Sequence, residues 1–179
     1  MKSRFEFKKI SGFSDFLKGL EGVDQLVKIR KSVNPKFELA GIVSKLDKGK
    51  AVLFESVKGS NIKVAANVLG TRHRIALSIN AKNENMIQER INEAIRNKPE
   101  ITNIERGNVW KKNSRSLYDL PIVTHFEKDS GAFITSSLVF GRDRETGYQN
   151  LSTHRLLRLD KKRMAIRMVE GRHLHKCFT

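Results

Sequence analysis

The sequence predicts an α+β protein in which an α/β domain over residues 1–110 is followed by an incomplete β-barrel over residues 118–179. In the first segment, apolar residues at helical spacing alternate with short apolar runs that are typical of buried strands. In the second segment, short strand patterns follow one another with turn residues between them, which favours a β-barrel or a β-sandwich. About four such strands are too few to close a barrel, so this unit is predicted to be incomplete.

The first helices are predicted from their apolar spacing and from the residues that begin them. Ser14 is a candidate N-cap for a helix over residues 13–20. Asn34 followed by Pro35 is a typical helix start, and the helix that follows is predicted to end at Gly49. Strands are predicted between the helices, over residues 26–30, 51–54 and 62–68.

Two more helices complete the first segment. Gly70 and Thr71 open one of them, either as a plain helix cap or as a phosphate site at the helix N-terminus. The other covers residues 85–97 and has a regular apolar face that is predicted to lie in the core. The members of this face are Ile87, Ile91, Ala94 and Ile95.

A polar stretch over residues 100–120 is predicted to separate the two segments. Beyond it, strands are predicted at residues 122–126 and 132–140. A hairpin follows, and its two strands flank the polar turn at residues 160–162.

The first strand of this hairpin contains a candidate functional arginine. The period of two puts Arg155 on the same face as four other residues, and this face is predicted to point toward the core. Those residues are Leu151, Thr153, Leu157 and Leu159. An arginine on a core face needs an anion beside it, which could be a protein carboxylate, a substrate carboxylate or a phosphate.

Asn150, Arg155 and His173 are predicted to meet at one end of the hairpin. An amide oxygen, a guanidinium and an imidazole suit a site that holds a metal and an anion together. The alternative is that Arg155 only reaches the rim of the barrel and that the histidines are ordinary surface residues.

Composition limits the classes of function. The net charge of +16 favours anionic partners such as nucleic acid, anionic lipid or phosphorylated ligands, although a generally basic surface would give the same charge. Cys177 is the single cysteine, so no intrachain disulfide can form, as expected for a cytoplasmic protein. Residues 1–10 lack the apolar run of a signal peptide, and no apolar run is long enough to span a membrane.

Several motifs resemble, in the same order along the chain, those of a known family. They occupy residues 51–55, 57–59, 70–72, 120–122, 131–135, 143–147, 150–155, 163–167 and 171–175. In these stretches the chain is similar to the 3-polyprenyl-4-hydroxybenzoate carboxy-lyases, the UbiD-type decarboxylases. The resemblance covers only the N-terminal portion of a usual family member.

The resemblance implies an α/β N-terminal domain followed by the first strands of a flavin-binding split β-barrel. It also implies prenylated FMN, Mn²⁺ and K⁺ as cofactors. The implied reaction is the reversible decarboxylation of aromatic or α,β-unsaturated acids, including polyprenyl-4-hydroxybenzoate-type substrates. The partner implied is therefore a small carboxylic acid.

Site residues follow from the same resemblance. Asn150 and His173 match metal-holding positions, and Arg155 matches the catalytic arginine that pairs with the substrate carboxylate and the essential acid. The residues that match cofactor-binding positions are Thr153, His154, Arg155, Arg167, Met168, Val169, Arg172 and His173.

One feature departs from the family pattern. The acidic metal ligand and the proton-donating acid come later in family members, and neither Glu145 nor Glu170 is at a matching position. Three explanations are open: a fragment of a longer protein, a second subunit that supplies the remainder, or a truncated gene product. A homo-oligomer or a second subunit is therefore an expected partner, and the chain alone is not expected to turn over substrate.

Two rival functions come from other classes. A flavin-binding subunit without chemistry of its own would carry the same motifs. A basic nucleic-acid-binding module would explain the charge, but the aromatic residues, 7% of the chain, are not interleaved with basic residues as stacking platforms would be. Nucleic acid is therefore not the expected partner.

Overall fold

The computed structural model describes residues 12–97 and 115–178. The described residues form two compact units, each with its own three-stranded sheet. The second unit combines residues 34–41, residues 58–61 and the described residues from 115 onward, and the first contains the others. The predicted α+β class is confirmed, while residues 1–10 and most of the predicted boundary at 100–120 lie outside the described ranges.

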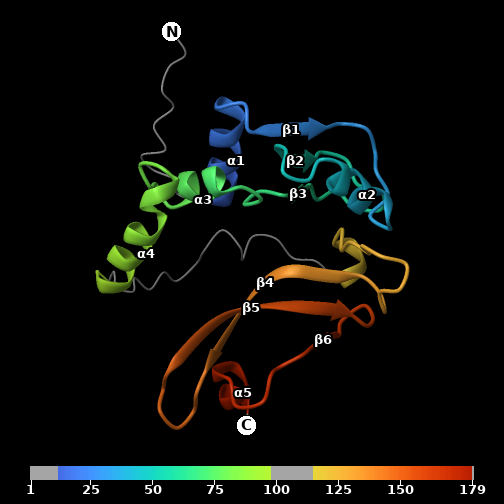
Figure 1. Ribbon diagram of the computed structural model, residues 1–179. Coiled ribbons are helices and arrows are strands. Elements are labelled where there is room, and N and C mark those ends of the chain that lie inside the picture. Colours follow the sequence, from blue (N-terminus) through green and yellow to red (C-terminus); the bar gives the residue numbers. More distant parts are fainter. Residues whose placement is uncertain (1–11, 98–114, 179) are drawn as a thin grey trace. The chain divides into compact units, whose positions relative to one another are not determined.

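The first unit is built on a mixed sheet (Figure 1). Its strands are β1 (Leu26–Ile29), β2 (Ala51–Phe54) and β3 (Val64–Ala66). Strand β1 pairs with β2 in parallel, and β2 pairs with β3 antiparallel. All three coincide with predicted strands, and β2 is central and almost fully buried because apolar side chains occupy both of its faces.

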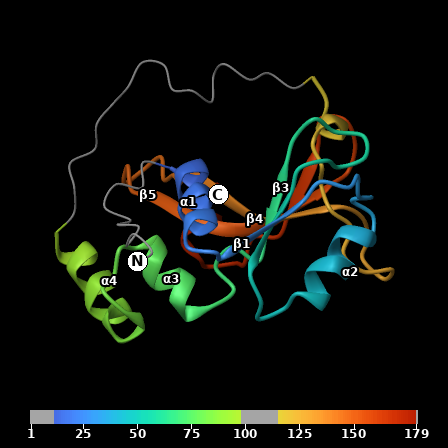
Figure 2. The same cartoon turned by 90° about the horizontal axis from the view of Figure 1, so that it is seen from above.

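The helices of this region are α1 (Phe13–Gly22), α2 (Glu38–Lys45), α3 (Arg72–Ser78) and α4 (Ile87–Arg96), with a 3₁₀ turn η1 (Glu84–Met86) before α4 (Figure 2). The prediction that Ser14 caps the first helix is wrong, because the helix begins one residue earlier and Gly12 occupies the cap position. Asn34 does organise a turn, since its Oδ1 accepts a hydrogen bond from the backbone N–H of Lys36 at 2.8 Å. Helix α2 itself starts only at Glu38.

The core of the first unit joins α1 to the sheet. Phe16 and Leu20 of α1 pack with Leu26 of β1 and Ala51 of β2, and all four are buried. Partly buried residues complete this cluster, namely Leu17, Leu53, Val68 and Leu77. The core therefore forms where the sequence pattern predicts apolar helix faces and apolar strands.

Helix α4 differs from its prediction. Ile87 is buried, but Ile91 is 39% exposed and Ile95 is 61% exposed. Only the first turn of α4 packs on the first unit, so most of the predicted core face is exposed in the described residues. The regular 3.6-residue period predicted the helix correctly but not its burial.

Arg74 is the largest fully buried side chain in the described residues, at 1% exposure. Its guanidinium donates hydrogen bonds to the backbone carbonyls of Val68 (3.0 Å), Gly49 (2.9 Å) and Asn67 (3.1 Å), and more weakly to Gln25 Oε1 (3.4 Å). Burial lowers the pKa of Arg74 from its usual value, but arginine remains charged in proteins. One side chain therefore connects the loops before β2 and before α3.

We predict that Arg74→Met destabilises the first unit by at least about 3 kcal/mol, because it leaves several buried carbonyl oxygens without a donor. The control is Arg72→Met, since Arg72 is exposed and donates only one long hydrogen bond to Glu84 O at 3.3 Å. Its effect should stay within about 0.5 kcal/mol. Urea denaturation followed by circular dichroism compares the two, and equal losses would contradict the role given to Arg74.

The sheet of the second unit is antiparallel, with β5 between β4 and β6 (Figure 1). Its strands are β4 (Phe133–Arg142), β5 (Gln149–Arg158) and β6 (Met164–Ile166). One extra residue in β4, between Ile134 and Ser137, forms a bulge in its pairing with β5. The described residues contain no closed barrel, and the predicted strand at 122–126 is reduced to single bridges at Val123 and Thr124.

Aspartate residues fix both hairpin turns. In the β4–β5 turn, Asp143 Oδ1 accepts backbone hydrogen bonds from Glu145 and Thr146, and Gly147 adopts a positive φ of 70°. In the β5–β6 turn, Asp160 Oδ1 accepts backbone hydrogen bonds from Lys162 and Arg163. These bonds lower the pKa of Asp143 and lower the pKa of Asp160 to about 2, as expected for carboxylates that accept backbone N–H groups.

A short helix, α5 (His173–Phe178), ends the described chain and contacts both β4 and β5. The sequence analysis did not predict it. Gly141 of β4 makes room for it, because a Cβ on Gly141 would lie 3.1 Å from Leu174 Cδ1 and 3.2 Å from Cys177 Cβ. The absence of a side chain at Gly141 therefore allows the helix to lie directly on the hairpin.

Candidate functional site

The candidate motif lies on β5, where side chains alternate between two sides of the sheet. Asn150 is buried and Ser152 and His154 are half-buried, whereas Leu151, Thr153 and Arg155 are exposed. We call the first side the helix side, because α5 lies on it, and the second side the open side. The six residues of the motif are therefore divided three and three.

This division corrects one prediction. Arg155 was predicted to point into the core together with Leu151, but both are exposed, and Leu151 is 63% exposed. Leu138 and Phe140 of β4 lie opposite β5 on the same side and are also exposed. The apolar pattern located the strand correctly, but the face that the described residues cover is the one with the more polar side chains.

A second prediction is only partly correct. Asn150 and His173 do lie on one side of the hairpin, since α5 begins at His173 and the His173 ring contacts the ring of Tyr148, with centroids 5.6 Å apart. Tyr148 is two residues before Asn150, so His173 lies near the same end of β5. Arg155 is on the other side of the strand and therefore does not join them.

Asn150 is the most buried member of the motif, at 9% exposure. Its Nδ2 donates to Ser152 Oγ at 3.0 Å, and Ser152 Oγ lies 2.9 Å from His154 Nε2. No described residue donates a hydrogen bond to Asn150 Oδ1, so this oxygen keeps both lone pairs for another ligand. An amide oxygen is a suitable ligand for a hard divalent cation.

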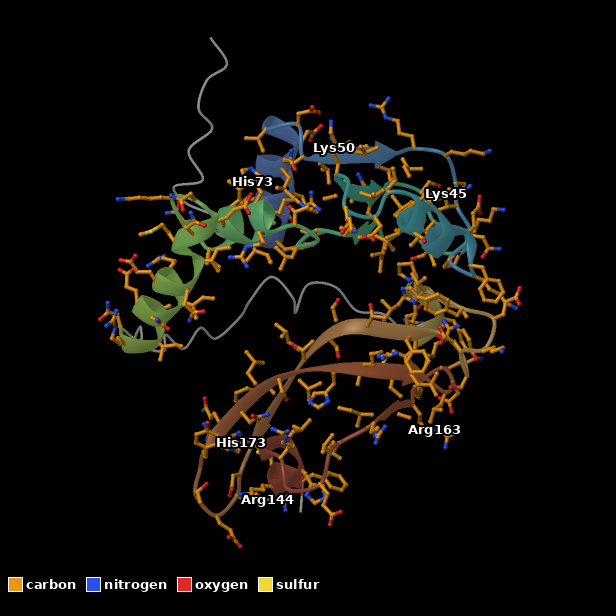
Figure 3. All side chains as sticks on the ribbon, viewed as in Figure 1. Lys45, Lys50, His73, Arg144, Arg163 and His173 are labelled. Carbon is orange, nitrogen blue, oxygen red and sulfur yellow. The ribbon has the colours of Figure 1, made fainter. Side chains whose placement is uncertain are left out.

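The remaining predicted residues follow β6. Arg167, Val169 and Arg172 are exposed, and Met168 is half-buried. The backbone N–H of Arg172 bonds to Val169 O at 3.2 Å, which closes the turn before α5. His173 marks the start of α5 near the β4–β5 turn, while Arg163 lies near β6 (Figure 3).

The exposed arginines have the chemistry of an anion site. Arg155, Arg167 and Arg172 form no ion pair with any residue that the structure describes. Between residues 142 and 176 the sequence has ten Lys or Arg and four Asp or Glu, a difference of +6. Such residues fit a bound phosphate, which attracts guanidinium groups through charge-assisted hydrogen bonds.

A metal would need ligands from outside the protein side chains that cluster here. No group of three or more His, Cys, Asp or Glu in the described residues is placed to hold a metal ion. Asn150 and His173 supply two ligand atoms of the right kind, and a flavin phosphate would supply oxygen ligands as well. The residues therefore fit a phosphate-bearing flavin together with a divalent cation.

The fold and this site correspond to a class of flavin-binding decarboxylases. The chain matches the structure of the UbiD-class enzyme HmfF from Pelotomaculum thermopropionicum in complex with FMN. The TM-score is 0.84 at 30% sequence identity, and the match covers 92% of this chain and 38% of that one. The closed form of vanillic acid decarboxylase from Sedimentibacter hydroxybenzoicus shares the fold, with a TM-score of 0.83 at 24% identity over 95% of this chain and 40% of that one.

Two family models identify the family itself. The N-terminal domain of 3-octaprenyl-4-hydroxybenzoate carboxy-lyase matches residues 17–95, and the Rift-related domain of the same enzyme matches residues 99–179. The chain therefore belongs to the UbiD family of carboxy-lyases, as the motifs predicted.

Curated relatives show the same relationship. Anhydromevalonate phosphate decarboxylase from Methanothermobacter thermautotrophicus is 34% identical over 154 residues, which are 86% of this chain and 36% of that protein. A 4-hydroxybenzoate decarboxylase component from Chlamydia pneumoniae is 28% identical over 85% of this chain and 30% of that protein. The chain thus spans about a third of the length of these relatives.

The two arginines of β5 should differ in their effect on stability. Arg158 lies over the ring of Tyr118, with its Cζ 4.6 Å from the ring centroid, so Arg158→Ala should cost about 1 kcal/mol. Arg155 is exposed and without a described partner, so Arg155→Ala should stay within about 0.5 kcal/mol. Thermal and urea unfolding of the two variants compares them, and a larger loss for Arg155→Ala would contradict the division of β5 into two sides.

Proposed function

We propose that this chain forms the flavin- and metal-binding part of a prenylated-FMN-dependent carboxy-lyase. Its family, the FMN complex of HmfF and the decarboxylase names of its relatives support this proposal. A related structure, an evolved dimeric form of HmfF, is a complex with prenylated FMN at 29% identity and a TM-score of 0.81, over 92% of this chain and 40% of that one. The observation that carries the proposal is the pairing of Asn150 and His173 on one side of a hairpin rich in exposed arginines.

In this proposal Asn150 Oδ1 and His173 hold Mn²⁺ beside the flavin phosphate, and K⁺ is a further cation of the site. The side chains and backbone that would contact the cofactor are those of Thr153, His154, Arg155, Arg167, Met168, Val169, Arg172 and His173. The positive charges of the arginines and the metal offset the charge of the phosphate.

Prenylated FMN, when bound, supplies the electron-accepting chemistry that loss of carbon dioxide requires. Arg155 binds and orients the substrate carboxylate, because its planar fork can donate two parallel hydrogen bonds to the two oxygens. Its exposure on the open side leaves it accessible to a small acid, and holding the acid in one orientation lowers the entropic part of the barrier.

Among aromatic and α,β-unsaturated acids, we favour a phosphorylated unsaturated acid over a polyprenylated hydroxybenzoate. Three relatives with 34%, 34% and 36% identity carry the name anhydromevalonate phosphate decarboxylase. The excess of basic residues between 142 and 176 suits a substrate with a phosphate as well as a carboxylate.

The remainder of the active site would come from the rest of a longer polypeptide, from a second copy or from a second subunit. The related structures include a dimeric form of HmfF and a vanillic acid decarboxylase that contains a separately named, truncated component. None of the helices in residues 12–97 and 115–178 is long and apolar enough to cross a membrane.

The test is co-expression with a flavin prenyltransferase, followed by a flavin absorbance spectrum and titration of the loaded protein with an α,β-unsaturated acid. We expect bound flavin, and we expect Arg155→Ala and Arg155→Lys both to weaken acid binding at least about tenfold, because neither retains the fork. Arg144→Ala removes the same charge from the exposed β4–β5 turn and should bind the acid normally.

The opposite result is also defined. A protein that purifies without flavin and binds DNA with a steep salt dependence would support the nucleic-acid-binding rival. Full binding of the acid by Arg155→Lys would show that a point charge is sufficient.

A further inference from the structure

We infer that Ser152 and His154 are positioning residues that hold the amide of Asn150 with its oxygen toward the metal. This inference rests on the proposed function, in which Asn150 Oδ1 is a metal ligand. It assigns His154 a role through Asn150, in addition to the cofactor contact that the family resemblance implies.

The geometry is a short chain of hydrogen bonds along the helix side of β5. Asn150, Ser152 and His154 are alternate residues of one strand, so their side chains share a side. Asn150 Nδ2 lies 3.0 Å from Ser152 Oγ, and Ser152 Oγ lies 2.9 Å from His154 Nε2. We call these three side chains the β5 relay.

The direction of these bonds decides which end of the amide faces outward. If the Ser152 hydroxyl accepts from Asn150 Nδ2, its own hydrogen can be donated to His154 Nε2. His154 must then be neutral with its proton on Nδ1. Asn150 Oδ1 then takes no part in the relay and is free to bind a cation.

The reverse direction would spoil the site. A His154 with its proton on Nε2 would donate to Ser152, and Ser152 would then donate to an amide oxygen turned toward it. The metal would face the NH₂ group of Asn150, which cannot be a ligand. The relay therefore selects between two orientations of an amide that have nearly the same shape.

The surroundings hold the relay in place. Ser137 Oγ of β4 donates to the backbone carbonyl of His154 at 2.7 Å, which ties the two strands together at this point. Asn150 is buried where Gly141 pairs with it and α5 covers the strand. Burial keeps water from competing freely for the amide, so its protein partner controls its orientation.

Two variants break the relay at different links. Ser152→Ala removes the central hydroxyl, and His154→Phe removes the acceptor while keeping a ring of similar size. Ser152→Thr keeps the hydroxyl and serves as the rescue. Ser137→Ala is the matched control, because it also removes one serine hydrogen bond from the same sheet but leaves the relay intact.

The first measurement needs neither flavin nor metal. Nitrogen-15 NMR of the full chain reports which ring nitrogen of His154 carries the proton, and the His154→Phe spectrum identifies the signal. We expect the Nδ1–H form in the unmodified protein. The Nε2–H form would overturn the inference whatever the function of the protein.

The second measurement is Mn²⁺ retention by flavin-loaded protein, followed by electron paramagnetic resonance. We expect Ser152→Ala and His154→Phe each to reduce bound Mn²⁺ at least about tenfold, within the range known for residues that orient metal ligands. The double variant should lose no more than either single one, because both break one relay. Ser152→Thr and Ser137→Ala should retain the metal.

The outcomes separate the two proposals. Equal Mn²⁺ retention in Ser152→Ala and the unmodified protein would overturn the relay but leave the proposed function intact. Absence of Mn²⁺ from the unmodified, flavin-loaded protein would overturn the proposed function and the relay with it. Loss of Mn²⁺ in Ser137→Ala as large as in Ser152→Ala would overturn the relay by assigning the effect to general disruption of the sheet.

Discussion

The alternation of side chains along β5 is the constraint on which the candidate site depends. Two neighbouring residues of a strand point to opposite sides of the sheet, so no rotation of a side chain can bring Asn150 and Arg155 to one side. Pairing with β4 and β6 fixes the register of β5, and a slip of one residue would exchange the two sides completely. The strand thus presents a metal-type ligand on one side and an anion-type ligand on the other.

Small local features maintain this register. The aspartate-centred turns at Asp143 and Asp160 fix both ends of β5, and the bulge in β4 adjusts its pairing at one point. Gly141 then determines what covers the helix side, because only a residue without a side chain lets α5 approach this closely. The position of His173 therefore depends on a glycine in another strand.

Much of the fold could be predicted from the sequence. The strands β1, β2, β4 and β5 and the turn before β6 follow from apolar patterning and turn residues, and these signals are local. Burial was less predictable: Ile95 has the spacing of a core residue but is exposed, since spacing records an apolar face and not what covers it. Arg74 was taken as part of a basic helix start, although its burial depends on carbonyl groups from distant loops.

The candidate site shows the same limit. Asn150 and His173 were correctly associated because β5 and α5 meet through contacts that the family resemblance anticipates. Arg155 was assigned to the wrong side because leucines were taken to mark the core, whereas burial of β5 follows α5 and not the most apolar face. The β5 relay was missed, although the alternate spacing of Asn150, Ser152 and His154 contained the signal.

The division of β5 into two sides can be measured directly by cysteine labelling. Residues 150–155 would be replaced by cysteine one at a time in a Cys177→Ser background, and the reaction rate with a thiol reagent would be measured for each. The alternation predicts fast reaction at positions 151, 153 and 155 and several-fold slower reaction at 150, 152 and 154. Uniform rates, or fast reaction at 150, 152 and 154, would contradict the placement of Asn150 and Arg155 on opposite sides.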